Sequence, residues 1–324
     1  MWHRAGVLAV ASLCMAQAPP SALPWIRVGG MVVDSHGWPP MSSTTVLTIW
    51  GPAVNETADL DPSGQFEFLV PTAGEYRIYV SIRSRLDRRL LEYASRTLPL
   101  AHGSSKAFVI RTTPAAALDG RVRFEGVPPT AADTIAISPE DGTGRGGFVG
   151  IQPAPVSGNA FEFLTFAGAW LLRPNGAGMR GRALQAVLCN GVDVTDVPTE
   201  FSPNDDIEVV VTSKVGAVEG RVTKGNGDAA DYAQVFLFAE DPAAWVPHSS
   251  RVYLTRSDAD GHFGLVAVRP GRYLIAATIF QRTVLPYEAP RDLLAAVASV
   301  ARRITIAEGA RVEDLIVTPL PREY

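Results

Sequence analysis

The chain has 324 residues, of which 47% are hydrophobic and 19% are charged, and its formal net charge is −4 at pH 7. This composition is typical of packed globular domains and excludes a disordered linker. The small negative charge argues against a general attraction to nucleic acid or to anionic lipid.

The first residues have the features of a secretory signal peptide. Arg4 places a positive charge before an apolar run at residues 5–16, which is too short to span a bilayer, and Ala16 and Ala18 are small residues of the kind found at cleavage sites. We therefore predict a signal peptide at residues 1–22, an extracytoplasmic location (periplasmic or secreted), and no stable membrane span after its removal. A buried N-terminal strand or helix is the alternative.

A glycine-anchored strand begins each of three similar units. Gly30, Gly120 and Gly220 each have an apolar residue two positions before them and a valine two positions after, and they lie 90 and 100 residues apart. A unit of about 100 residues is a whole domain rather than a solenoid repeat. The predicted β-sandwich domains are residues 23–113, 114–215 and 216–324.

A second pattern follows each of these strands. In the third unit an Asp-x-x-Gly turn and a short strand are followed by a Pro-Gly turn and a second strand, over residues 258–277. Two strands joined by a short turn predict a β-hairpin. Weaker copies of the pattern lie at residues 61–80 and 157–172.

The order of these motifs resembles the carboxypeptidase regulatory-like domain, a transthyretin-like (prealbumin-like) β-sandwich that is grouped with carbohydrate-binding-like folds. The third unit matches best, in segments 218–222, 233–238, 258–263 and 269–273. The first unit lacks the proline of the Pro-Gly turn, and the second lacks the aspartate before its first turn. The resemblance implies an all-β, bacterial, secreted protein of three tandem Greek-key sandwiches.

One short helix is predicted near the C-terminus, at residues 288–301. Pro290 suits the first turn of a helix, and Leu294, Val297 and Ala301 are spaced by three and four residues along one face. We expect this face to pack on the third sandwich.

The histidines do not form the zinc-binding pattern of a carboxypeptidase. That pattern needs a His-x-x-Glu pair and a distant histidine, but proline, serine, arginine and leucine follow three residues after His36, His102, His248 and His262. The resemblance is therefore to the accessory domain of such enzymes. The Gly-rich loop at residues 141–147 lacks the Gly-Lys-Ser/Thr ending of a phosphate-binding loop. We predict no enzymatic activity and no cofactor.

Asp258 and Asp260 form a candidate calcium site. Two carboxylates at alternate positions before a glycine match the start of a calcium-binding loop. Apolar Leu265 and Val266 follow where further oxygen ligands would be needed. The alternative is that the aspartates stabilise a turn through backbone hydrogen bonds.

Aromatic residues suggest a candidate ligand site. Trp245 lies in the loop at residues 241–248, where an exposed indole could stack on a sugar, and Tyr253 and Trp170 could act similarly. The indole could instead pack over the end of the sandwich. We favour a non-catalytic structural or protein-interaction module with a protein partner at the cell envelope; the alternative is binding of a polysaccharide through the aromatic residues of the third domain.

Overall fold

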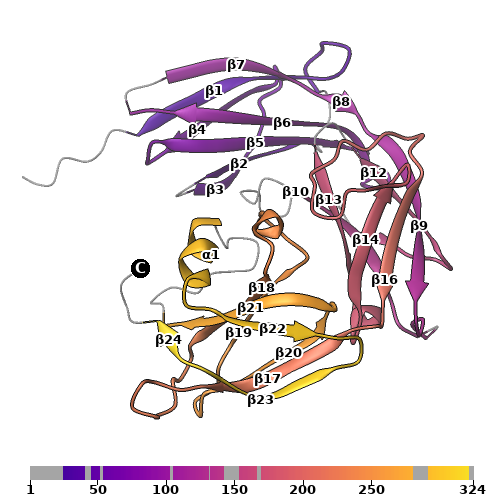
Figure 1. The fold of residues 1–324 in the computed structure, drawn as a ribbon. Coiled ribbons are helices and arrows are strands. Elements are labelled where there is room, and N and C mark those ends of the chain that lie inside the picture. The colour runs from indigo at the N-terminus through magenta and orange to yellow at the C-terminus, as the bar shows by residue number, and fades with distance from the viewer. Residues whose placement is uncertain are drawn as a thin grey trace, which may run out of the picture.

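The computed structural model describes residues 25–40, 45–51, 54–102, 105–130, 132–141, 153–165, 169–279 and 291–320. The predicted signal peptide and residues 142–147 of the Gly-rich loop lie outside this set. The described residues form an all-β, multi-domain sandwich fold with one α-helix, which confirms the predicted fold class. Figure 1 shows a curved arrangement in which β1, β9 and β17 lie on the outer side and β2, β13 and β18 on the inner side.

The first sandwich pairs two sheets around one core. One sheet has the order β4 (Gln65–Val70), β1 (Ile26–Val33) and β7 (Ser105–Arg111). Strand β1 is antiparallel to β4 and parallel to β7. The other sheet has the order β3 (Val54–Ala58), β2 (Thr45–Gly51), β5 (Gly74–Arg83), β6 (Leu90–Leu100) and β8 (Thr113–Pro114). The boundary predicted after residue 113 falls within β8.

The third sandwich repeats this plan. Its outer sheet has the order β20 (His262–Val268), β17 (Gly216–Val222) and β23 (Arg311–Val317), with β17 parallel to β23. Its inner sheet has the order β19 (Val252–Arg256), β18 (Gln234–Ala239), β21 (Gly271–Thr278) and β22 (Arg302–Ile306), and β24 (Pro319–Leu320) also pairs with β21. Alternate residues of these strands point inward and form a single apolar core.

The second sandwich differs in the position of one strand. Its outer sheet has the order β12 (Ala160–Thr165), β9 (Ala116–Glu125), β16 (Ile207–Thr212), β14 (Ala183–Cys189) and β15 (Val192–Asp193). Its inner sheet contains β11 (Ala154–Pro155), β10 (Ala136–Asp141) and β13 (Trp170–Asn175). Strand β14 thus joins the outer sheet, whereas β6 and β22 of the other sandwiches pair within the inner sheets.

Each anchoring glycine pairs with a phenylalanine on the neighbouring antiparallel strand. The pairs are Gly30 with Phe66, Gly120 with Phe161 and Gly220 with Phe263. In each pair the phenylalanine ring lies where a Cβ atom added to the glycine would be placed. The absence of a Cβ atom therefore allows an aromatic side chain to cover the centre of each outer sheet.

The predicted hairpins are wrong. Strands β20 and β21 lie in opposite sheets, as do the corresponding strands β4 with β5 and β12 with β13. The turn is an arch that crosses the core, because both strands carry apolar residues that are buried only when the two sheets face each other. In the third sandwich the Tyr273 hydroxyl donates to the Arg269 carbonyl at 2.8 Å, and in the first the Tyr76 hydroxyl donates to the Thr72 carbonyl at 2.9 Å.

The predicted helix is confirmed as α1 (Arg291–Ala298). It covers the face of the inner sheet of the third sandwich that points away from the core between the two sheets. Leu294 and Val297 are buried against Phe236 and Phe238 of β18. Both faces of β18 are therefore covered, which explains why every residue of this strand is buried. In the described part of the chain, no helix has the length and apolar character needed to cross a membrane.

An aromatic cluster joins the first and second sandwiches. Trp170, at the start of β13, is only 5% exposed and packs with Tyr79, Leu90 and Tyr93 of the first sandwich. In the motif order, Trp170 stands where Tyr76 and Tyr273 stand in the other sandwiches. We refer to this contact as the aromatic seam.

Candidate interaction surface

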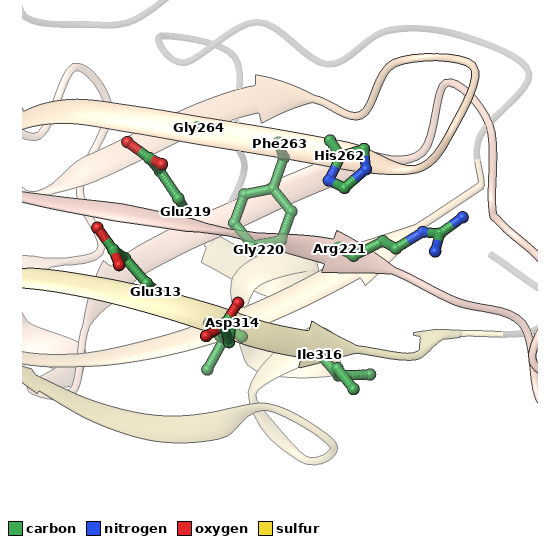
Figure 2. Close-up of a pocket in the computed structure, with 10 residues that line it drawn as sticks. Glu219, Gly220, Arg221, His262, Phe263, Gly264, Glu313, Asp314 and Ile316 are labelled. Atoms are coloured by element: carbon green, nitrogen blue, oxygen red, sulfur yellow. The ribbon is translucent and has the colours of Figure 1, made fainter.

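The outer face of the sheet β20-β17-β23 contains a groove of about 620 Å³. Its floor is the backbone around Gly220, and Gly264 leaves one side without a side-chain wall. Figure 2 shows Glu219 and Glu313 next to each other at one end of this groove, and Arg221 and His262 at the other end. The groove is therefore an open surface with opposite charges at its two ends.

A bulge in β23 shapes one wall of the groove. Val218 pairs with Val312, but Gly220 pairs with Leu315, so β23 has one residue more than β17 between these pairs. Asp314 in the bulge has a φ of 55°. Bulges change the direction of side chains along an edge strand. Here both Glu313 and Asp314 are exposed on the groove side.

The charged groups of the groove are held by a few short contacts. Arg311 forms ion pairs with Glu219 at 2.7 Å and with Glu313 at 3.8 Å. At the other end, the Nε atom of Arg221 donates to the Asp260 carbonyl at 2.8 Å. Glu219 is half-buried, and Arg221, Arg311 and Glu313 are exposed, so these pairs position charge at the surface but add little stability.

Exposed apolar side chains flank the same face. Val266 on β20 is 70% exposed and Ile316 on β23 is 62% exposed. These two side chains add exposed apolar area beside the charged groups of the groove.

The corresponding faces of the other sandwiches differ. The first has a groove of about 540 Å³ over Gly30, where Arg27 and Glu67 form an exposed ion pair at 3.4 Å. In the second sandwich, Glu208 accepts hydrogen bonds from Arg123 at 2.8 Å and from Arg121 at 2.9 Å. The hydrogen bonds from Arg123 hold the pKa of Glu208 below its usual value. On the second sandwich both arginines pair with carboxylates, whereas on the third Arg221 donates to a backbone carbonyl. The groove of the third sandwich is therefore the better candidate for a contact.

Trp245 and Tyr253 do not line this groove. The Trp245 indole is 7% exposed, donates its Nε1–H to the Ala239 carbonyl at 2.8 Å and packs edge-on against Phe238. The Tyr253 hydroxyl accepts the Arg269 amide at 3.1 Å, and its ring contacts Tyr273. In this structure the Trp245 indole is buried and Tyr253 is half-buried.

Asp258 organises the turn before β20. One of its carboxylate oxygens accepts the backbone N–H of Asp260 at 2.9 Å and that of His262 at 2.8 Å. Asp61 makes the equivalent bonds to Ser63 and Gln65 in the first sandwich. Among the described residues, no group of three or more His, Cys, Asp or Glu side chains is arranged to hold a metal ion.

The sequence analysis missed Glu219, Arg221 and Glu313 as surface residues. Glu219 and Arg221 alternate with the apolar anchors of β17, which is the pattern of a strand with one face in solvent. Glu313 could not be placed because its position depends on the bulge in β23.

No protein-family model matches the chain, and comparison with curated proteins finds no match. Among solved structures, a streptococcal ancillary pilin aligns at 12% identity and a TM-score of 0.24, covering 92% of this chain and 100% of that chain. BcpA, the major pilin subunit of Bacillus cereus, aligns at 10% identity and a TM-score of 0.24, covering 91% and 99%. The Bacillus anthracis TIE protein aligns at 12% identity and a TM-score of 0.22, covering 91% of this chain but only 50% of that one. At these TM-scores the similarities have no bearing on function.

Proposed function

We propose that the chain is a non-catalytic, secreted protein that acts as a structural or protein-interaction module through the outer face of its third sandwich. The observation that supports this most directly is the open groove over Gly220, where exposed charges of both signs lie beside exposed Val266 and Ile316. A protein partner with complementary charges would bury these apolar side chains and gain orientation from the charged ends.

The proposal also covers the organisation of the chain into tandem domains behind a signal peptide. The repeated Gly–Phe pairs support tandem units, and the motif order supports a relationship to the carboxypeptidase regulatory-like domain. A signal peptide at residues 1–22 would deliver the chain to the periplasm or the cell surface. The proposed units are residues 23–113, 114–215 and 216–324.

Carbohydrate binding remains the alternative, with a polysaccharide of the cell envelope as the ligand. Binding through Trp245 would require its indole to leave the contact with Phe238 and to break its hydrogen bond to the Ala239 carbonyl. The geometry therefore favours a protein partner at the groove.

The test is capture of envelope proteins by the immobilised chain of residues 23–324, followed by the same experiment with a double charge reversal, Glu219→Lys and Glu313→Lys. A partner of the groove should be captured by the wild type and lost with the reversal. Glu67→Lys is the matched control, because it changes the equivalent face of the first sandwich. Equal capture by all three proteins would reject the groove as the contact surface, and saturable binding to insoluble polysaccharide that is lost with Trp245→Ala would support the alternative.

A further inference from the structure

The contact between the second and third sandwiches is built from charged and polar groups. Arg173, on β13, forms an ion pair with Asp196 at 2.9 Å, and the two side chains are only 13% and 20% exposed. The same guanidinium donates across the contact to the backbone carbonyl of His248 at 2.8 Å. We refer to this contact as the polar seam.

Asp196 connects the two sandwiches directly. Its carboxylate accepts the backbone N–H of Ser250 at 2.8 Å and the Ser250 hydroxyl at 2.9 Å. The Ser250 hydroxyl in turn accepts a hydrogen bond from Arg269 at 2.9 Å. A continuous chain of hydrogen bonds therefore runs from Arg173 through Asp196 and Ser250 to Arg269.

A second bond closes the seam beside the first. The Nδ1 atom of His248 lies 3.1 Å from a carboxylate oxygen of Glu140, on β10. An ionised carboxylate only accepts hydrogen bonds, so Nδ1 carries the proton in this contact. His248 has a φ of 57°, a left-handed conformation that is uncommon outside glycine, and the bond to its carbonyl holds it there.

The seam is partly buried and rich in cations. Burial lowers the pKa of both Arg173 and Arg269, and the nearby Arg251 lowers the pKa of Arg269 further. The groups that face the seam are Glu140 on β10, Arg173 on β13, Asp196 after β15, His248 and Arg251 between β18 and β19, Arg269 after β20, and Tyr253 and Tyr273 on β19 and β21. Among these groups three guanidinium ions face two carboxylates, so the seam already has an excess of positive charge.

We infer that the polar seam is an acid-sensitive clasp that releases the third sandwich from the second when its carboxylates are protonated. Protonation of Asp196 would leave the buried guanidinium of Arg173 without its ion-pair partner, which is a costly state. Protonation of Glu140 would increase the positive excess further and weaken its contact with His248. Exposure to water relieves both penalties, so acid favours the open arrangement.

The aromatic seam provides an internal contrast. Its contacts are made by apolar and aromatic side chains. Burial raises the pKa of Tyr79 and Tyr93 above the usual value for tyrosine, so neither group changes charge in acid. The inference therefore goes beyond the proposed function: acid should change the arrangement at one seam and leave the other closed.

The test is small-angle X-ray scattering of the chain of residues 23–324 at about pH 7.5 and about pH 3, a range that spans the ordinary pKa values of histidine and the carboxyl groups. The wild type should expand reversibly in acid, and Asp196→Asn should be expanded already at the higher pH. Asp206→Asn is the control, because this carboxylate pairs with Arg121 on the exposed outer sheet. It should behave as the wild type does.

Hydrogen–deuterium exchange of the wild type shows which of the two seams opens in acid, and it needs no variant. Backbone amides at residues 249–252 should exchange about tenfold faster in the open state after correction for pH, while those around Tyr93 should keep their protection. Unchanged dimensions and protection of the wild type across this range would overturn the clasp. So would an Asp196→Asn protein that folds and keeps the dimensions of the wild type at the higher pH.

Discussion

Phe263 and Gly220 lie directly opposite each other on β20 and β17, and the phenylalanine ring fills the space above the glycine. A Cβ atom on Gly220 would lie 2.2 Å from the Leu315 carbonyl oxygen and 2.9 Å from the ring. Contacts this short require the backbone of β23 to move. The same arrangement recurs at Gly30 and Gly120, so the repeated glycine is a packing requirement of each outer sheet.

Gly220→Ala should therefore destabilise the third sandwich by about 3 kcal/mol, since the added methyl group meets backbone atoms that cannot rotate away. The measurement is chemical denaturation of the chain of residues 23–324, followed by tryptophan fluorescence, to which Trp245 of the third sandwich contributes.

Gly264→Ala is the matched control on the neighbouring strand. The nearest atom to its new Cβ would be the Glu219 Cγ, at 3.9 Å, which is an ordinary contact. This variant should unfold within about 0.5 kcal/mol of the wild type. Equal destabilisation by both substitutions would mean that loss of glycine flexibility, and not the fit under Phe263, sets the cost.

The sequence predicted the features that depend on local pattern. The anchoring glycines, the Asp-x-x-Gly turn and the apolar face of the helix at Leu294 and Val297 all follow from spacing, because strands and helices bury alternate or every third and fourth residue. The arch at Tyr273 was interpreted as a hairpin because the turn residues are the same in both cases. Only the pairing partners of β20 and β21 distinguish the two.

Contacts between distant segments could not be predicted in this way. Trp170 occupies a position where the motif order expects a tyrosine, and no local signal shows that its indole packs on the first sandwich. Asp196 and Ser250 are 54 residues apart in the chain and meet only because the second and third sandwiches touch. The groove depends similarly on the bulge at Asp314.

Tyr273→Phe should destabilise the third sandwich by about 1.5 kcal/mol, because the Arg269 carbonyl in the arch loses its buried hydrogen-bond donor. Thermal unfolding measures the loss. Tyr232→Phe is a suitable control, because Tyr232 is 62% exposed and should tolerate the change. A Tyr273→Phe protein as stable as the wild type would show that the bond does not hold the arch.

The same hydroxyl should make stability depend on alkaline pH. Burial raises the pKa of Tyr273 above the usual value, so above about pH 10 the unfolded chain releases a proton that the folded chain retains. The unfolded state then binds fewer protons, and stability falls as pH rises. The stability difference between the wild type and Tyr273→Phe should therefore shrink above about pH 10, and a constant difference from pH 7 upward would contradict this account.

Asp258→Ala should destabilise the third sandwich by about 1 kcal/mol, because the backbone N–H groups of Asp260 and His262 lose their acceptor. Asp260→Ala removes a carboxylate that makes neither bond and should have little effect. If the two aspartates instead bind calcium, about 5 mM Ca²⁺ should raise the unfolding temperature of the wild type and of neither variant. We expect no such rise, and calorimetry with Ca²⁺ provides an independent check.

Trp245→Ala should destabilise the third sandwich by about 3 to 5 kcal/mol, since it leaves a cavity beside Phe238 and removes the hydrogen bond to Ala239. Denaturation of the chain of residues 23–324 measures this cost. Trp38→Ala is the control, because the Trp38 side chain is exposed in a turn of the first sandwich and its removal opens no cavity.

The Trp245→Ala variant also distinguishes packing from sugar recognition. If the Trp245 indole serves packing alone, any polysaccharide binding by the wild type should persist in Trp245→Ala under conditions where the variant stays folded. A folded Trp245→Ala protein with near-normal stability and no polysaccharide binding would instead mean that the indole leaves its contact with Phe238 to meet a ligand. The stability measurement decides between these cases because a buried indole cannot be removed without cost, whereas an indole that turns outward can.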